Sequence, residues 1–341
     1  GAEAAGISAK VDAALAFAKQ VVDSGAQYFR GNPAVGERLK KITELSRNYL
    51  AHEYFNKDWR ITAFSDMAAT LDAAKLSFVA SAHLIDHVDA INLTQDGQKL
   101  LAGVNHPILR QSVRDYFVNQ QFRRDVFMKG PRHFTKLQNA EAVLSERFVL
   151  TTAAESVPRK VAGALGEATL QDKVYDPIIA ALAENGYSPK LLRDLVTHPN
   201  LRSLQLAQVV QALVVLAGAG HVSLAQAVSK QVRTQCAALN RYLCERARGS
   251  SEVAFLASPV VGGGIFVPRL EQVFLLAQSP GKRSAQDLAK FAWDVLKRQG
   301  QHMMKEGKPL QTEAENLEEL SKLAETFLKR LPILTSLEIA Q

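Results

Sequence analysis

Cysteine is scarce in this chain, which has only Cys236 and Cys244 among its 341 residues. The two lie eight positions apart inside one helical pattern, and a helix that rises 1.5 Å per residue would separate their Cα atoms by about 12 Å. A disulfide requires Cα atoms closer than about 7 Å. We therefore expect two buried free thiols, as in proteins of a reducing, cytoplasmic compartment.

Long apolar runs are also missing. A membrane-spanning helix needs roughly 18 or more consecutive apolar residues, and the longest candidate, 204–219, is interrupted by Gln205, Gln208 and Gln211. Residues 1–10 have no basic start followed by an apolar stretch, so we expect no secretory signal there. The sequence predicts no membrane partner.

Phosphate-binding glycine loops are not found either, and neither are side-chain groups suited to covalent catalysis. Residues 163–168 have the wrong spacing for a phosphate loop. The three glycines at 262–264 lie between two apolar runs, which is typical of a hairpin tip, where glycine adopts positive φ at low cost. Neither cysteine has a nearby histidine, and Ser258-Pro259 does not form a nucleophile elbow. No catalytic residue is therefore assigned.

The patterns that are present predict a mainly α-helical protein with small β elements, an α+β fold. Apolar residues at three-, four- or seven-residue steps predict an amphipathic helix over 8–30, and a second helix is expected over 33–50. Residues 76–80 and 124–128 have the composition of short buried strands bounded by polar turns. With helices between them, the two strands predict a small α+β unit over 49–137.

The second half of the chain has the element order of a winged helix, with one extra helix inserted before the wing. The expected elements are a strand over 147–152, a hairpin over 160–170, helices over 175–184, 189–196, 204–216 and 225–247, and a hairpin around 262–264. Ser188 and Ser203 are expected to cap the second and third of these helices. Two further helices follow, one capped by Ser284 and one opened by a capping box of Thr312 and Glu315.

The four-residue spacing of His83 and His87 is the only histidine pattern that suggests a metal site. On a helix, this spacing would place two imidazoles on one face. However, the segment follows a strand and includes Ile85 and Val88, and the glutamate of a zinc protease is missing. Surface or partly buried histidines with local hydrogen bonds are the favoured interpretation, and no metal is assigned.

Two other segments combine polar groups with aromatic rings. Residues 49–56, followed by Trp59, contain a titratable base, an acid and several rings. The alternative to a functional role is a structural one, in which the segment is a helix end whose rings pack in the core. Residues 115–125 have a similar composition, and their structural alternative is a helix-to-strand junction in which Arg123 or Arg124 pairs with an aspartate at either end of the segment.

The stretch His52-Glu53-Tyr54, the strand at 76–80 and residues 119–129 together resemble the methyltransferase regulatory domain, which follows the SAM-binding domain in a group of bacterial methyltransferases. The group includes protein lysine methyltransferases that modify outer-membrane proteins. Residues 15–19 resemble its helical connector, and 257–264 resemble its C-terminal winged-helix-like domain. The implied organisation is a connector over 1–48, the regulatory domain over 49–137, a winged-helix-like domain over 138–281 and helices that pack on it over 282–341.

The resemblance implies that this chain is not catalytic alone. In that group a donor loop precedes the region, whereas here no strand ends in an acidic residue followed by Gly-x-Gly, and the chain starts after that point. We expect a regulatory, substrate-positioning and oligomerising part of a SAM-dependent methyltransferase, with SAM bound only in the full-length enzyme. The implied partners are the SAM-binding catalytic domain of the same protein, a protein substrate and further copies of the chain.

His52, Glu53, Tyr54 and Arg123 are the site candidates, because they are polar, adjacent to rings and within the segments that carry the resemblance. Their expected role is substrate contact or domain docking. If the two strands of the regulatory unit extend the catalytic sheet, they leave an edge that another copy or the N-terminal helices would pair.

Two other functions remain open. In a winged-helix regulator the helix over 204–216 would read the major groove, but it has glutamines and no Lys or Arg. The net charge of +7, from 41 basic and 34 acidic residues, offers little positive charge for binding phosphates. Binding of nucleic acid is therefore disfavoured. The other possibility is a purely structural interaction domain held by the amphipathic helices at 11–29 and 313–331.

Overall fold

The computed structural model describes residues 6–278 and 284–340. The chain folds as two units, residues 1–69 and 70–341. It is 58% helical, and its small sheets of two or three strands are all antiparallel, so the predicted α+β class is confirmed. Among the described residues, no helix has the length and apolar content needed to cross a bilayer. The four predicted domain boundaries stay a prediction.

The first unit is a small group of helices. They are α1 (Ile7–Asp23), α2 (Gln27–Gly31), α3 (Pro33–Thr43) and α4 (Arg47–Glu53), and α5 (Phe64–Asp72) runs on into the second unit. The expected continuous helix over 8–30 is wrong, because Gly25 adopts a left-handed φ of 76° and breaks it. Ser46 caps α4 through the backbone N–H of Tyr49. Val11, Leu15 and Leu50 form the core of the unit.

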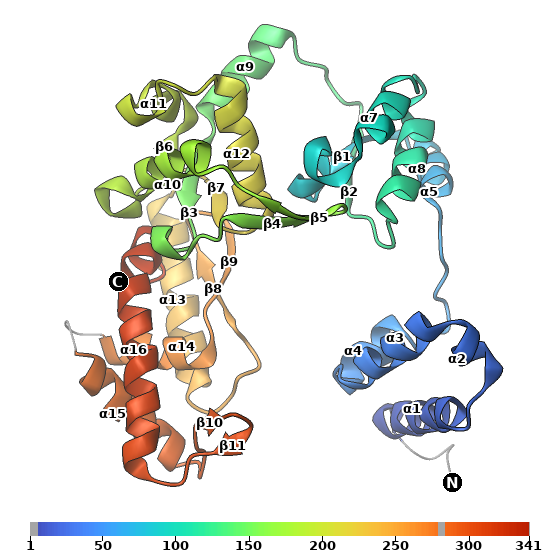
Figure 1. The fold of residues 1–341 in the computed structure, drawn as a ribbon. Coiled ribbons are helices and arrows are strands. Elements are labelled where there is room, and N and C mark those ends of the chain that lie inside the picture. The colour runs from blue at the N-terminus through green and yellow to red at the C-terminus, as the bar shows by residue number, and fades with distance from the viewer. Residues whose placement is uncertain (1–5, 279–283, 341) are drawn as a thin grey trace. The chain divides into compact units, whose positions relative to one another are not determined.

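The second unit begins with the helices and strands that surround the candidate site (Figure 1). They are β1 (Leu76–Ser81), the 3₁₀ turn η1 (Leu84–His87), α6 (Asp89–Asn92), α7 (Gln95–Ala102), α8 (Pro107–Val118) and β2 (Asp125–Lys129). β1 and β2 form an antiparallel ribbon in which Phe78 lies opposite Phe127, with their ring centroids 5.7 Å apart. Thr94 caps α7, and His106 precedes the proline that opens α8.

A three-stranded sheet in the order β6–β3–β7 and a hairpin follow. The elements are α9 (Lys136–Ser145), β3 (Arg147–Leu150), η2 (Ala154–Ser156), β4 (Lys160–Gly163), β5 (Gly166–Thr169), α10 (Asp172–Tyr187), β6 (Lys190–Leu191), α11 (Leu192–Thr197), η3 (Pro199–Leu201), α12 (Leu206–Gly218) and β7 (Val222–Ala225). The predicted hairpin over 160–170 is confirmed as β4–β5. Leu150, Ile178 and Leu213 are fully buried in the core of this part.

The C-terminal part packs four helices around a second core (Figure 1). Its elements are α13 (Lys230–Ala247), β8 (Phe255–Ser258), β9 (Gly263–Phe266), α14 (Arg269–Gln278), α15 (Ala285–Lys297), β10 (Met304–Lys305), β11 (Lys308–Pro309) and α16 (Glu313–Ser336). Phe274 and Phe327 meet at its centre, with ring centroids 5.5 Å apart. Both cysteines are free, as predicted, but only Cys244 is buried, so the expected burial of Cys236 is wrong.

The predicted helix over 225–247 starts too early. Residues up to Ala225 belong to β7, whose Val222 pairs with Leu150 in β3, and Ser229 caps α13 by accepting from the N–H of Val232. Ala225 ends the strand and residues 226–229 have no regular structure, so the helix begins five residues later than expected. The sheet that results places α12 against η1.

Candidate functional site

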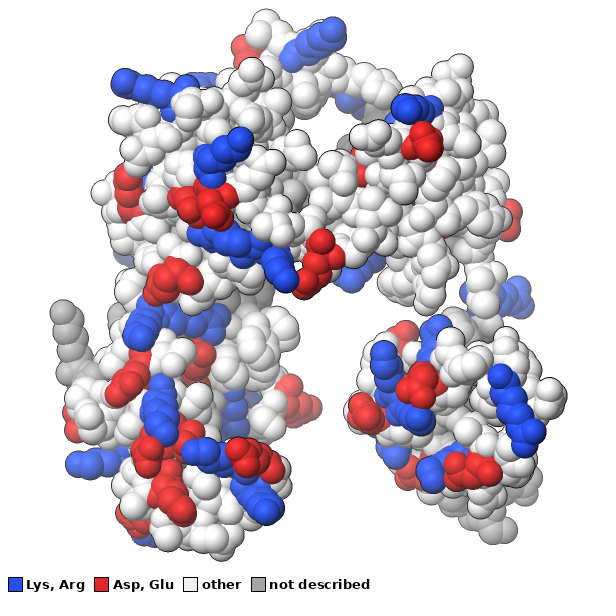
Figure 2. Space-filling view, in the orientation of Figure 1, with Lys and Arg blue, Asp and Glu red and all other residues white. Residues whose placement is uncertain are grey.

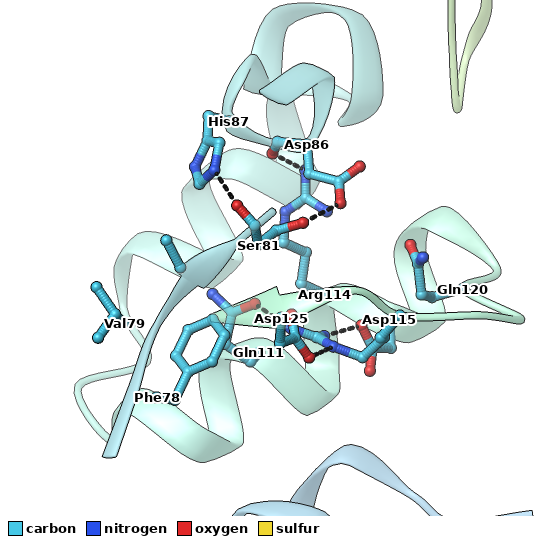
Figure 3. A pocket seen from close by; sticks show the side chains of 12 residues that line it. Phe78, Val79, Ser81, Asp86, His87, Gln111, Arg114, Asp115, Gln120 and Asp125 are labelled. Atoms are coloured by element: carbon cyan, nitrogen blue, oxygen red, sulfur yellow. Dashed lines mark hydrogen bonds and ion pairs between the residues drawn. The ribbon is translucent and has the colours of Figure 1, made fainter. Parts of the chain in front are cut away.

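A polar cavity of about 150 Å³ lies between β1, η1, α8 and β2 (Figure 3). Its wall contains three carboxylates, two guanidinium groups and one imidazole. These belong to Asp86, Asp115, Asp125, Arg114, Arg123 and His87. The cavity is the candidate site because it gathers charged groups from η1, α8, β2 and the segment between α8 and β2 in one partly enclosed space.

Arg123 is the centre of this cavity. Its Nε and Nη2 donate to the two carboxylate oxygens of Asp125 at 2.7 and 3.1 Å, and Nη1 donates to Asp115 in the last turn of α8. Nη2 also donates to Gln111 at 3.1 Å, and the guanidinium lies 5.7 Å from the ring centroid of Phe78. The side chain is only 17% exposed. One guanidinium therefore joins α8, β2 and the aromatic face of β1.

The backbone brings Arg123 to this position. Asn119 follows α8 in a left-handed conformation with a φ of 49°, which asparagine tolerates better than most residues. The N–H of Gln120 then bonds back to the carbonyl of Asp115. This tight turn reverses the chain, so that Arg123 meets the helix it has just left.

A second polar cluster closes the other end of the cavity. The hydroxyl of Ser81 donates to Asp86 at 2.7 Å, and Nδ1 of His83 lies 3.1 Å from the same carboxylate. His87 donates from Nε2 to the carbonyl oxygen of Ser81 at 2.9 Å, and Arg114 donates to the carbonyl oxygen of Asp86. Both histidines thus make local hydrogen bonds, as predicted, and the segment is a 3₁₀ turn that does not place them on one helical face.

The carboxyl groups at the two ends respond differently to their surroundings. Burial raises the pKa of Asp115, and the nearby Asp125 carboxylate adds to that rise against the opposing effect of Arg123. Burial also works to raise the pKa of Asp86, but hydrogen bonds from Ser81 and His83 lower it overall. For Arg123, burial is outweighed by the two aspartates, so its pKa rises and it remains charged.

This arrangement suits binding and positioning better than bond-making. Every charged group described above already has a partner of opposite charge or a hydrogen bond, and the guanidinium groups do not exchange protons near neutral pH. In the described parts of the chain, no group of three His, Cys, Asp or Glu residues could hold a metal ion. A ligand here would be recognised by hydrogen bonds and charge, with the ion pairs serving as a rigid frame.

The four residues predicted as candidates fall in two different units. His52 and Glu53 are exposed at the end of α4 in the first unit, and Arg123 belongs to the second. Tyr54 packs against the small core of the first unit, and its ring lies 6.4 Å from that of Trp59. The structural alternative, a helix end with packed rings, describes Tyr54 well. The role of all four as site residues stays a prediction.

Sequence reasoning missed most of the cavity wall. Gln111 and Arg114 lie one turn apart on α8 and gave no signal, because an isolated Arg or Gln on an amphipathic helix is ordinary. The sequence indicated His87 only as a possible metal ligand, together with His83. The pairing of Arg123 with Asp115 and Asp125 was anticipated as a structural alternative and is confirmed.

The part of the chain that forms the cavity matches a known protein family. Residues 46–129 match the family described as a predicted methyltransferase regulatory domain. Over this range, about a quarter of its length, the chain is similar to that family. The resemblance expected from the sequence is confirmed to this extent, and every residue that lines the cavity lies within the matched range.

Two further proteins extend the comparison beyond residues 46–129. The uncharacterized protein sll1526 of Synechocystis sp. is 44% identical over 337 residues, which covers 98% of this chain and 65% of that protein. The chain thus spans less than two thirds of that relative's length. PKMT2 from Rickettsia typhi in complex with AdoHcy has a similar fold, with a TM-score of 0.60 and 13% identity, covering 95% of this chain and 66% of PKMT2. A second PKMT2 structure gives a TM-score of 0.56.

Proposed function

We propose that this chain is the regulatory and substrate-positioning part of a SAM-dependent methyltransferase. The observation that carries the proposal is the regulatory-domain match over 46–129. The fold likeness to the lysine methyltransferase PKMT2, whose structure contains AdoHcy, supports it over nearly the whole chain. A protein with an accessible lysine is the acceptor that this likeness favours.

The topology of the sheets supports placing the methyl donor elsewhere in the protein. Adenosine-containing cofactors in α/β folds bind beyond the carboxyl ends of parallel strands, next to a helix N-terminus. Every strand pair described in this chain is antiparallel, and the largest sheet has three strands. We therefore assign SAM to a part of the whole enzyme that these residues do not include.

The outer face of the β1–β2 ribbon supports a docking role for the regulatory domain. Val79, Val126 and Met128 are each more than 40% exposed on it. A two-stranded sheet has an outer edge on each strand, and exposed edges with apolar side chains favour further strand pairing. In this proposal the catalytic part of the protein, or another copy of the chain, packs on this ribbon.

One feature of α12 counts against the nucleic-acid alternative. Gln205 and Gln208 form a capping box at its start, in which each side chain bonds the other's backbone N–H, so two of the three glutamines that could read bases are occupied. Figure 2 shows Lys and Arg mixed with Asp and Glu on the visible face, without a continuous basic stripe. Phosphate binding usually requires such a stripe.

The test uses the whole methyltransferase that contains this region. Arg123→Lys keeps the charge but loses the paired hydrogen bonds to Asp125, so we expect the KM for the acceptor protein to rise about tenfold while the affinity for SAM stays unchanged. Arg124→Lys is the matched control, because Arg124 is the exposed neighbour on the same turn and should leave the KM unchanged. Thermal unfolding of both variants separates loss of folding from loss of positioning.

His52→Ala tests the second candidate segment in the same assay, and a rise in acceptor KM would support a role in substrate contact. A drop in SAM affinity in Arg123→Lys, or an equal effect of Arg124→Lys, would contradict the proposal. Salt-sensitive binding of the chain to duplex DNA would favour the nucleic-acid alternative.

A further inference from the structure

A second and larger cavity, of about 760 Å³, lies between α9, α12 and the η1–α6 segment. α12 lines it with Leu206, Val210 and Val214, which recur every fourth residue and so share one face. Another face of the same helix is packed in the core through Val209 and Leu213. α12 thus carries apolar side chains on two faces, one in the core and one facing this groove.

The wall formed by α9 changes from polar to apolar along the helix. Lys136, Asn139 and Val143 line the groove from successive turns. Lys136 is exposed, and in the part of the chain that the structure describes it forms no ion pair. The first turn of α9 contains no acidic residue, so the helix dipole adds to the positive potential at this end.

The opposite wall offers little uncompensated negative charge. Its only carboxylate, Asp89, lies 3.9 Å from the guanidinium of Arg114. Val88, beside it, is buried and apolar. The groove therefore presents a mainly apolar surface with one unpaired cation at the first turn of α9.

We infer that this groove binds an anionic amphiphile, a molecule with an aliphatic tail and a carboxylate head. Small-molecule sites are typically cavities of about 300–1,000 Å³ that lie between structural parts and have apolar walls with a few placed polar groups. The tail packs against Val143, Val210 and Val214, and the carboxylate meets Lys136 and Asn139. The positive end excludes a cationic head and favours the carboxylate over a neutral alcohol.

The proposed binding does not involve Arg123, and His87 is the one residue that lines both this groove and the polar cavity. The test therefore uses this chain alone, with decanoate as the probe, below its micelle-forming concentration. Decanoate should displace the fluorescent anion 8-anilinonaphthalene-1-sulfonate in a saturable way. Decanol and decylammonium should each compete at least about fivefold more weakly, as expected for loss or reversal of one exposed charge contact.

Two variants locate the site. Ala207→Glu places a bulky anion in the groove from an exposed position on α12, and it should abolish decanoate binding without a loss of stability. Lys136→Glu should weaken decanoate and strengthen decylammonium. Lys173→Glu is the matched control, since Lys173 is also an exposed lysine in the first turn of a helix and lies outside the groove.

Several results would overturn the inference. They are the lack of saturable displacement by decanoate, unchanged binding in Ala207→Glu, equal effects of Lys136→Glu and Lys173→Glu, and equal competition by decylammonium and decanoate. None of these outcomes bears on the methyl-transfer assays, so the two proposals can fail separately.

Discussion

The side-chain oxygen of Asn92 accepts a hydrogen bond of 2.9 Å from the backbone N–H of Ala164, 72 residues further along the chain. The amide nitrogen of Asn92 donates at the same time to the carbonyls of Ile85 and Val88 at 2.7 and 3.0 Å. Asn92 is only 5% exposed. One buried amide thus holds η1 and α6 together and attaches them to the tip of the β4–β5 hairpin.

Replacing Asn92 with alanine should destabilise the second unit. The substitution leaves the buried N–H of Ala164 without its partner, whereas the carbonyls of Ile85 and Val88 keep their bonds to backbone N–H groups. Such an unsatisfied group typically costs about 1–3 kcal/mol. We expect the free energy of unfolding, measured in urea, to fall by about 1–3 kcal/mol. Asn139→Ala, at an exposed asparagine, should change it by about 0.5 kcal/mol or less. Equal effects of the two substitutions would show that the Asn92 bonds do not join these segments.

The contact between Gly218 and Ile85 gives a second prediction about the same junction. A Cβ added at Gly218 would lie 2.7–2.9 Å from side-chain and backbone atoms of Ile85, which is closer than real contacts allow. Gly218→Ala should therefore lower stability by about 1–3 kcal/mol through overpacking. Gly249→Ala has open space around it and should be near neutral. A stable Gly218→Ala protein would mean that α12 does not pack this closely on η1.

His221 should make stability depend on pH. Burial lowers its pKa below the usual 6.5 of histidine, because the charged imidazolium is poorly solvated there. A pKa depressed in the folded state means that the unfolded chain binds the proton more tightly, so this stabilising contribution is present above pH 6.5 and is lost as the pH falls through the native pKa. His221→Gln should show a shallower loss of stability on acidification in chemical denaturation. An unchanged slope would contradict the assignment.

The two cysteines should differ in reactivity. Burial raises the pKa of the Cys244 thiol to about 12, with a smaller contribution from Glu245. Only the thiolate reacts readily, so near pH 8 Ellman's reagent should modify Cys236 quickly and Cys244 only on unfolding. Cys236→Ser should remove the fast phase. A fast phase of two thiols in the native protein would show that the helix α13 opens at Cys244.

Local signals in the sequence predicted local structure well. Thr312 and Glu315 form the expected capping box at the start of α16, because both bonds lie within four residues. The strand at 76–80 is β1, extended by one residue. Such features depend on neighbouring residues alone, which is why spacing and residue type were enough to find them.

Features that depend on distant partners could not be predicted in this way. Neither Ser188 nor Ser203 is the N-cap of a helix, because α11 begins only after β6 pairs with β3, and Gln205 is the N-cap of α12. Glutamine is not a preferred N-cap residue, so the sequence gave no reason to expect it there. In the site, Arg114 donates a hydrogen bond to the carbonyl of Asp86, 28 residues away, and no local sequence pattern predicts that contact.

The central claim, that this region positions a substrate and leaves methyl-donor binding to the rest of the enzyme, is tested most directly by titrating SAM into this chain in a calorimeter. The account predicts no saturable heat of binding at SAM concentrations that saturate the whole methyltransferase. Saturable binding of one SAM per chain would contradict it and would place the donor site within these 341 residues.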